Sequence, residues 1–175
     1  MTAVWPKSVT LAEVSRGPVS LELAADEASR KKIAKTLGLE SLGKLEAKVK
    51  LTVWLDGAEM KGRVKADVVQ TCSVSAESLP AKIDADFMVR LLPPGSPNAP
   101  SDDSPEIDIE HDAEDQPDVL ETETVDVSGY VVEHLSLELD PFPRKAGAQF
   151  VQPPEPVDLS PFAALKSLQK PKADE

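Results

Sequence analysis

The chain has 175 residues, a formal net charge of −12, one cysteine and 16 prolines. This length suits one domain with tails, and the composition excludes collagen, coiled coils and disulfide-rich scaffolds. No run of 18 apolar residues is present and the first residues lack a continuous apolar stretch, so we expect neither a membrane-spanning helix nor a secretory signal. A lone Cys72 cannot form an intrachain disulfide, and we expect a reducing, cytoplasmic compartment.

The charge is unevenly distributed along the chain. Residues 91–143 contain no Lys or Arg and 15 Asp or Glu, which leaves 19 basic and 16 acidic residues elsewhere. A slightly basic body therefore carries a strongly acidic segment. The overall charge does not exclude a nucleic-acid partner, because charge acts locally along the surface.

The N-terminal part predicts a strand followed by a helix. Residues 18–23 alternate apolar and polar side chains, which is typical of a short strand. Residues 25–37 favour a helix that ends at Gly38 and has an apolar stripe of Ile33, Ala34 and Leu37. The remainder of this helix is cationic through Arg30, Lys31, Lys32 and Lys35.

Residues 44–91 contain three runs in which every second residue is apolar, over 45–55, 60–68 and 79–91. Between the first two runs, Asp56-Gly57 is typical of a two-residue hairpin turn. Three such runs predict an antiparallel β-meander of three or more strands with one buried face. With the flanking helices the fold class is α+β, and the pattern leaves open whether the sheet stays open or curls toward a barrel.

The turn also sets an expected register. With Asp56 and Gly57 as the loop, apolar side chains lie opposite apolar ones along both strands, for example Val49 opposite Val64. Turn chemistry and hydrophobic pattern therefore agree on this register.

On the other face, the same register places Lys50 opposite Arg63 and Lys48 opposite Lys65. Like charges directly opposite each other destabilise a sheet, so stability alone does not favour this arrangement. The cluster, with Lys61 beside it, predicts an anion-binding surface. The alternative is an ordinary solvated sheet face with splayed lysines.

We expect the chain to have four parts, of which the first two are a core and an acidic insert. Residues 1–92 form the β-meander core with its N-terminal strand and helix. Residues 93–124 form an acidic insert, which we expect to be disordered because it has too few large apolar side chains to offset the entropy of ordering. This insert binds a basic partner, screens a basic face of the chain, or serves only as a solubilising loop.

The C-terminal part predicts two helices. Residues 125–150 supply a helix over 129–139, capped by Asp126 or Ser128, and a Pro-rich turn, both packed on the core. Residues 151–175 supply a Pro-rich linker and a short helix that starts at Ser160-Pro161. This helix docks on the body or on a partner through the apolar stripe of Phe162, Leu165 and Leu168.

No motif supports an enzyme, metal or cofactor site. A glycine-rich phosphate loop, HExxH and GxSxG are all absent from the sequence. We interpret His111, in the acidic insert, and His134, on the polar side of its helix, as solvated side chains. Cys72 continues the inward-facing register of its strand and is expected to be a small buried residue rather than a nucleophile. We expect no catalytic residue, no metal and no cofactor.

Three segments carry a family resemblance. They are the cysteine segment 68–75 (VVQTCSVS), the segment 125–144 (VDVSGYVVEHLSLELDPFPR) and the tail 160–168 (SPFAALKSL), in this order. Together they resemble the YceD family, the large ribosomal RNA subunit accumulation proteins of bacteria and plastids. Many members carry Cys-x-x-Cys at the first segment, whereas this chain has Cys72 and Ser75, so a role for that pair is not expected here.

The resemblance implies a non-enzymatic factor that supports the synthesis, processing or accumulation of large-subunit rRNA. Its partner would be that rRNA or a pre-ribosomal particle, contacted through phosphates. The cationic residues available for this contact are Lys48, Lys50, Lys61, Arg63 and Lys65, with Arg30, Lys31, Lys32 and Lys35. The alternative is an acidic adaptor or chaperone that holds a basic ribosomal protein without RNA contact. No membrane partner is expected, and the oligomeric state stays open.

Overall fold

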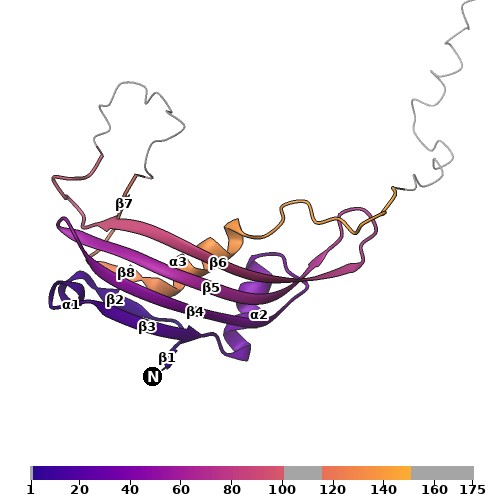
Figure 1. The fold of residues 1–175 in the computed structure, drawn as a ribbon, viewed down its shortest axis with the longest axis horizontal. Helices are drawn as coiled ribbons and strands as arrows, with labels where there is room; N and C mark the ends of the chain where they lie inside the picture. Colours follow the sequence, from indigo (N-terminus) through magenta and orange to yellow (C-terminus); the bar gives the residue numbers. More distant parts are fainter. Residues whose placement is uncertain (1, 101–115, 151–175) are drawn as a thin grey trace, which may run out of the picture.

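A computed structural model describes residues 2–100 and 116–150 of the chain. It has three helices and eight strands in the described ranges (Figure 1). In chain order they are β1 (Thr2–Val4), β2 (Ser8–Thr10), α1 (Leu11–Ser15), β3 (Val19–Ala24), α2 (Glu27–Thr36), β4 (Ser41–Trp54), β5 (Gly57–Thr71), β6 (Ser78–Leu92), β7 (Asp118–Val119), β8 (Thr124–Asp126) and α3 (Val127–Leu137).

The main sheet has six strands in the order β1-β3-β4-β5-β6-β7, and β2 pairs with β8 in a second, two-stranded sheet. Strands β3 to β6 are antiparallel, whereas β1 pairs with β3 and β7 pairs with β6 in parallel. The α+β class is confirmed. The prediction of a purely antiparallel sheet is wrong, because the parallel edge strands have only two or three residues and show no period in the sequence. The sheet is open, with β1 and β7 at its two borders.

The register of the first hairpin differs from the prediction by two residues. Trp54 pairs with Gly57, so the loop is Leu55-Asp56 rather than Asp56-Gly57. Leu55 takes the positive φ of the turn, at 50°. Gly57 lies inside β5, where an added Cβ would overlap the backbone carbonyl of Leu91. A shift of two residues keeps every side chain on its predicted face, since side chains alternate with a period of two.

One face of the sheet forms the core with the helices that cover it (Figure 1). The strand residues at its centre are fully buried, among them Leu51, Met60 and Val64. Helices α2 and α3 pack on the same face through Ile33 and Leu135. Val53, predicted to lie on this face, is beside the turn and is 57 % exposed, which corrects that prediction.

Two of the three predicted helices, those over 25–37 and 129–139, lie within two residues of their expected positions as α2 and α3. Asp26 caps α2 by accepting a hydrogen bond from the Ser29 N–H at 2.7 Å. Asp126 caps α3 by accepting one from the Gly129 N–H at 3.0 Å, as predicted. Helix caps can be predicted from the sequence, because the capping side chain accepts a hydrogen bond from a backbone N–H that has no partner within the helix.

Residues 93–100 and 116–124 of the predicted acidic insert are described by the structure, and both stretches contact the rest of the chain. Leu120 is buried and its N–H donates to the Leu92 carbonyl at 2.9 Å. At the other end, Ser96 and Asn98 donate to one carboxylate oxygen of Asp56, at 3.0 and 2.9 Å. These hydrogen bonds and the burial of Leu120 connect both described stretches to the sheet. Composition alone does not reveal such contacts.

Two predicted features lie outside the described residues. Residues 101–115 include His111, and residues 151–175 include the predicted linker and the helix with Phe162, Leu165 and Leu168. Over the ranges 2–100 and 116–150, none of the helices is long and apolar enough to cross a membrane.

Candidate nucleic-acid interface

The face of the sheet opposite the helices carries polar side chains in rows that cross the strands. Each row takes one outward-facing residue from β3, β4, β5 and β6, at positions that the strand pairing places opposite one another. Two neighbouring rows hold four of the nine predicted cationic residues. They are Glu22, Lys48, Arg63, Asp86 and Ser20, Lys50, Lys61, Met88.

A groove of about 910 Å³ lies between these two rows. Its lining includes both rows and the intervening residues Leu21, Val49, Gly62 and Phe87, which belong to the inward-facing register. Adjacent strands are about 4.8 Å apart, and the two rows are roughly 7 Å apart along the strands. The four cations at the middle of the rows therefore line the groove from adjacent positions on β4 and β5. These cations are Lys48, Arg63, Lys50 and Lys61.

The first row is flanked by acids at both ends. Lys48 Nζ lies 2.8 Å from a carboxylate oxygen of Glu22, and Arg63 Nε lies 3.8 Å from Asp86. A hydrogen bond to Lys48 lowers the pKa of Glu22, and the same bond raises the pKa of Lys48. Both pairs are largely exposed, so solvent screens them and their contribution to stability is small.

A third acid, Asp84, contacts Arg63 from the next position on the same face of β6, although it does not line the groove. Its carboxylate lies 2.5 Å from Arg63 Nε and 3.3 Å from Lys65 Nζ. The hydrogen bond from Arg63 holds the pKa of Asp84 below its usual value. Arg63 is thus the cation of the cluster most engaged by carboxylates, and Lys65 lies beside a smaller hollow of about 250 Å³.

The second row is the more positive side of the groove. It ends in Ser20 and Met88, which carry no charge. Lys50 makes no ion pair with any described residue, and Lys61 pairs at 2.6 Å with Glu59, which lies outside the groove lining. Lys50 and Lys61 are directly opposite each other. An anion in the groove would therefore relieve the repulsion between these two ammonium groups.

The structure brings together only part of the predicted cationic surface. The cluster on β4 and β5 is present, but Lys50 opposes Lys61 and Lys48 opposes Arg63, which corrects the predicted pairs. The like-charge opposition itself survives, since the two-residue shift exchanges one cation for another. Lys65, predicted to face a cation, faces Glu46.

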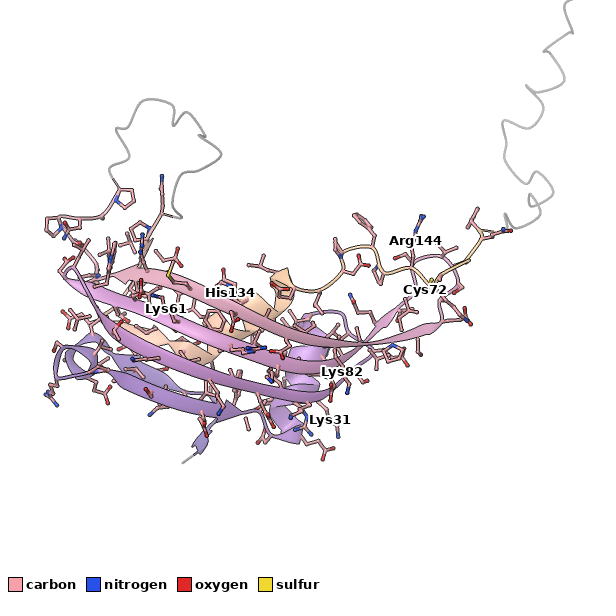
Figure 2. All side chains as sticks on the ribbon, viewed as in Figure 1. Lys31, Lys61, Cys72, Lys82, His134 and Arg144 are labelled. Carbon is pink, nitrogen blue, oxygen red and sulfur yellow. The ribbon has the colours of Figure 1, made fainter. Side chains whose placement is uncertain are left out.

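The cations of α2 do not join the groove. This helix packs on the opposite, buried face of the sheet, and Figure 2 shows Lys31 on α2 well separated from Lys61. Arg30 donates to the Ala25 carbonyl at 2.8 Å, and Lys31 pairs with Glu27 at 2.6 Å. The predicted set that included Lys32 and Lys35 therefore divides into two surfaces on opposite sides of the sheet.

The carboxylates of β6 were missed as part of the site. Their signal was present in the sequence, because Asp84 and Asp86 occupy polar positions of the third alternating run. In a meander that run pairs with the strand holding Arg63. Glu22 gave a weaker signal, since the partner of a short N-terminal strand is not fixed by its sequence.

Cys72 lies in the loop between β5 and β6, beside the segment that follows α3 (Figure 2). It is buried, as predicted, but it is outside the apolar core cluster. Its Sγ accepts hydrogen bonds from the backbone N–H groups of Ser75 and Lys145, each at 3.4 Å. Hydrogen bonding by the Ser75 side chain, followed by these backbone groups, lowers the pKa of Cys72 to about 6.

His134 is half-buried rather than solvated, which corrects its predicted setting. Its ring stacks on Phe87, with centroids 4.4 Å apart and planes inclined by 14°. Phe87 in turn covers Gly62, where an added Cβ would overlap the ring. Within the described residues, no three His, Cys, Asp or Glu side chains gather as a metal site.

Comparison with protein families gives one result for this chain. The model described as large ribosomal RNA subunit accumulation protein YceD matches residues 60–169, which is more than half of the chain. The matched range contains Lys61 and Arg63 of the groove, whereas Lys48 and Lys50 precede it. Comparisons with curated proteins and with solved structures give no match.

Proposed function

Because this chain belongs to the YceD family of large ribosomal RNA subunit accumulation proteins, we propose that it supports large-subunit rRNA accumulation by binding RNA, without catalysing a reaction. The groove between the two rows is the proposed contact. The observation that carries the proposal is the group of four cations that line that groove from adjacent positions on β4 and β5, two of them on a row without acids.

The groove suits the sugar-phosphate backbone better than the bases. Its one aromatic lining residue, Phe87, belongs to the inward-facing register and stacks on His134. Recognition of unstacked bases in single strands uses exposed aromatic platforms, which the groove lining does not offer. Phosphate contacts fix position and carry little sequence information, so binding would depend on RNA shape and on salt.

The test is a pair of charge-reversal variants with the same change in net charge. Lys50→Glu/Lys61→Glu alters the groove, and Lys32→Glu/Lys35→Glu alters α2 on the other side of the sheet. Binding of a large-subunit rRNA fragment is measured over a series of salt concentrations. We expect the groove variant to bind about tenfold or more weakly, and its salt slope to fall by about 1 for each phosphate that the altered side chains no longer neutralise.

The α2 variant should bind nearly as the unaltered chain does. Equal weakening in the two variants would show that only net charge matters, and unchanged binding in the groove variant would contradict the proposed contact. The remaining explanation would then be the adaptor function, in which the acidic segment holds a basic ribosomal protein.

A further inference from the structure

Asp86 is an acid in the lining of the cationic groove, and the rest of the chain engages it only weakly. It pairs with Arg63 across β5 and β6, with both side chains on the open face of the sheet. Arg63 Nε lies 3.8 Å from the Asp86 carboxylate, which is too long for a hydrogen bond. The Asp86 side chain is 76 % exposed, and no described residue donates a hydrogen bond to it. The carboxylate therefore keeps its acceptor positions open to a ligand of the groove.

The two other acids beside these cations differ from Asp86. Glu22 also lines the groove, but its carboxylate lies 2.8 Å from Lys48 Nζ and is engaged by that ammonium group. Asp84, at the next outward position of β6, is hydrogen-bonded to Arg63 and does not line the groove. Local ion pairs thus account for Glu22 and Asp84. They do not account for Asp86.

A free carboxylate is unfavourable in a groove that binds phosphates, because it repels the negative charge of every phosphate. The repulsion is offset only where the ligand brings a hydrogen-bond donor to the carboxylate. Along a polynucleotide backbone, the phosphate oxygens and the sugar ring oxygens only accept hydrogen bonds. The ribose 2′-hydroxyl is the donor of that backbone, and DNA lacks it. An exposed acid among cations therefore fits an RNA backbone better than a DNA backbone.

We propose that Asp86 accepts a hydrogen bond from a ribose 2′-hydroxyl and so selects RNA over DNA in the groove. The scale of the site fits this contact, because adjacent strands are about 4.8 Å apart and Asp86 lies one strand away from the cations of β5. In RNA the 2′-hydroxyl and the 3′-phosphate are on adjacent carbons of one sugar, so the two groups suit acceptor and cation on neighbouring strands. The inference rests on the proposed function, since it names the polymer that the same groove takes.

The two polymers differ in how each meets this carboxylate. RNA exchanges a hydrogen bond to water for one to Asp86, and hydrogen bonds to charged groups are among the stronger ones in proteins. DNA meets only the negative charge. We therefore expect the unaltered chain to bind RNA about tenfold more tightly than DNA of the same sequence, at one fixed salt concentration.

The test compares three single-stranded oligonucleotides of one unstructured sequence. The first is RNA, the second is DNA with deoxyuridine in place of thymidine, and the third is RNA in which fluorine replaces each 2′-hydroxyl. The fluorinated RNA keeps a substituent at the 2′ position but has no donor there, so it separates hydrogen bonding from the shape of the sugar. Dissociation constants are measured by fluorescence anisotropy at fixed salt, because phosphate contacts depend on ionic strength.

Two variants with the same change in net charge complete the comparison. Asp86→Ala removes the proposed acceptor, and Asp84→Ala is the matched control at the next outward position of β6, outside the groove lining. Both residues are exposed, so both variants should fold, which circular dichroism checks. Asp86→Ala should tighten the binding of DNA and fluorinated RNA and bring the three oligonucleotides to nearly equal affinity. Asp84→Ala should keep the RNA preference, because it removes only a general repulsion.

Equal binding of RNA and DNA by the unaltered chain would overturn the inference and leave the proposed function intact. An RNA preference that persists in Asp86→Ala, or one that fluorinated RNA shares, would also overturn it. Failure of the proposed function would have a different signature, because Lys50→Glu/Lys61→Glu would then bind RNA as tightly as the unaltered chain does. The result expected is an RNA preference that disappears in Asp86→Ala, persists in Asp84→Ala and requires the 2′-hydroxyl.

Discussion

The two faces of strands β4 to β6 are made from the same stretches of chain and differ in almost every physical property. On the covered face, Leu51, Met60 and Val64 are fully buried. On the open face, Lys50 and Lys61 stand in solvent one residue away. The period of two thus separates the residues that stabilise the sheet from those free to bind a ligand.

The largest loss of stability is expected for substitutions on the covered face. Leu51→Ala and Met60→Ala should each lower the free energy of unfolding by about 2–5 kcal/mol, because each leaves a cavity in a packed core. Lys50→Ala and Lys61→Ala, at the neighbouring positions, should change it by no more than about 0.5 kcal/mol. Denaturant titration of the four variants measures the contrast. Equal destabilisation on the two faces would refute the separation.

A smaller loss of stability is expected for a substitution at Gly57, on the open face of the sheet. Gly57 has the outward register, yet an added Cβ would overlap the backbone carbonyl of Leu91. Gly57→Ala should therefore destabilise the chain by about 1–3 kcal/mol, as overpacking against rigid neighbours does. Gly43→Ala is the matched control, since its Cβ would meet Asp67 only at the ordinary distance of 3.7 Å. The comparison would need revision if thermal unfolding ranked the two variants in the other order.

A pH-dependent effect concerns an exception on the covered side. Cys72 has the inward register, but hydrogen bonds lower its pKa from 9.0 to about 6. A lowered pKa stabilises the folded chain fully above pH 9, and this stabilisation disappears as the pH falls through about 6. The free energy of unfolding, relative to that of Cys72→Ser, should therefore decrease as the pH falls from about 9 to about 6.

Ultraviolet titration of the thiolate provides the direct readout for this exception. Absorbance that depends on Cys72 should appear near pH 6 in the unaltered chain. In Ser75→Ala it should appear at higher pH, because the first of the hydrogen-bonding groups is removed. Titration near pH 9 in both proteins would contradict the assigned cause.

The central strands and the cation cluster could be predicted because both follow from local patterns. Alternation assigned Lys50 and Lys61 to one face whatever the register, and Asp26 and Asp126 marked the helix starts. The register could not be predicted, because it depends on Leu55 adopting a positive φ, which Asp56-Gly57 was better suited to adopt. The sequence therefore predicted a two-residue turn correctly, but placed it one residue too far along the chain.

Other features depended on contacts between distant parts of the chain. The short strands β7 and β8 form only because residues 118–126 meet β6 and β2. The position of α2 on the covered face separates Lys32 and Lys35 from the groove, and no local pattern reports which side of a sheet a cationic helix covers. The acids beside Arg63 were visible in the sequence once pairing of β5 with β6 was assumed.

The most direct test of the account is complementation in cells that lack this protein and accumulate too little large-subunit rRNA. The measured quantity is the ratio of large-subunit to small-subunit rRNA. Lys32→Glu/Lys35→Glu should restore the ratio as the unaltered chain does, whereas Lys50→Glu/Lys61→Glu at equal abundance should not. Full restoration by the groove variant would contradict the claim that these cations connect the sheet to ribosomal RNA.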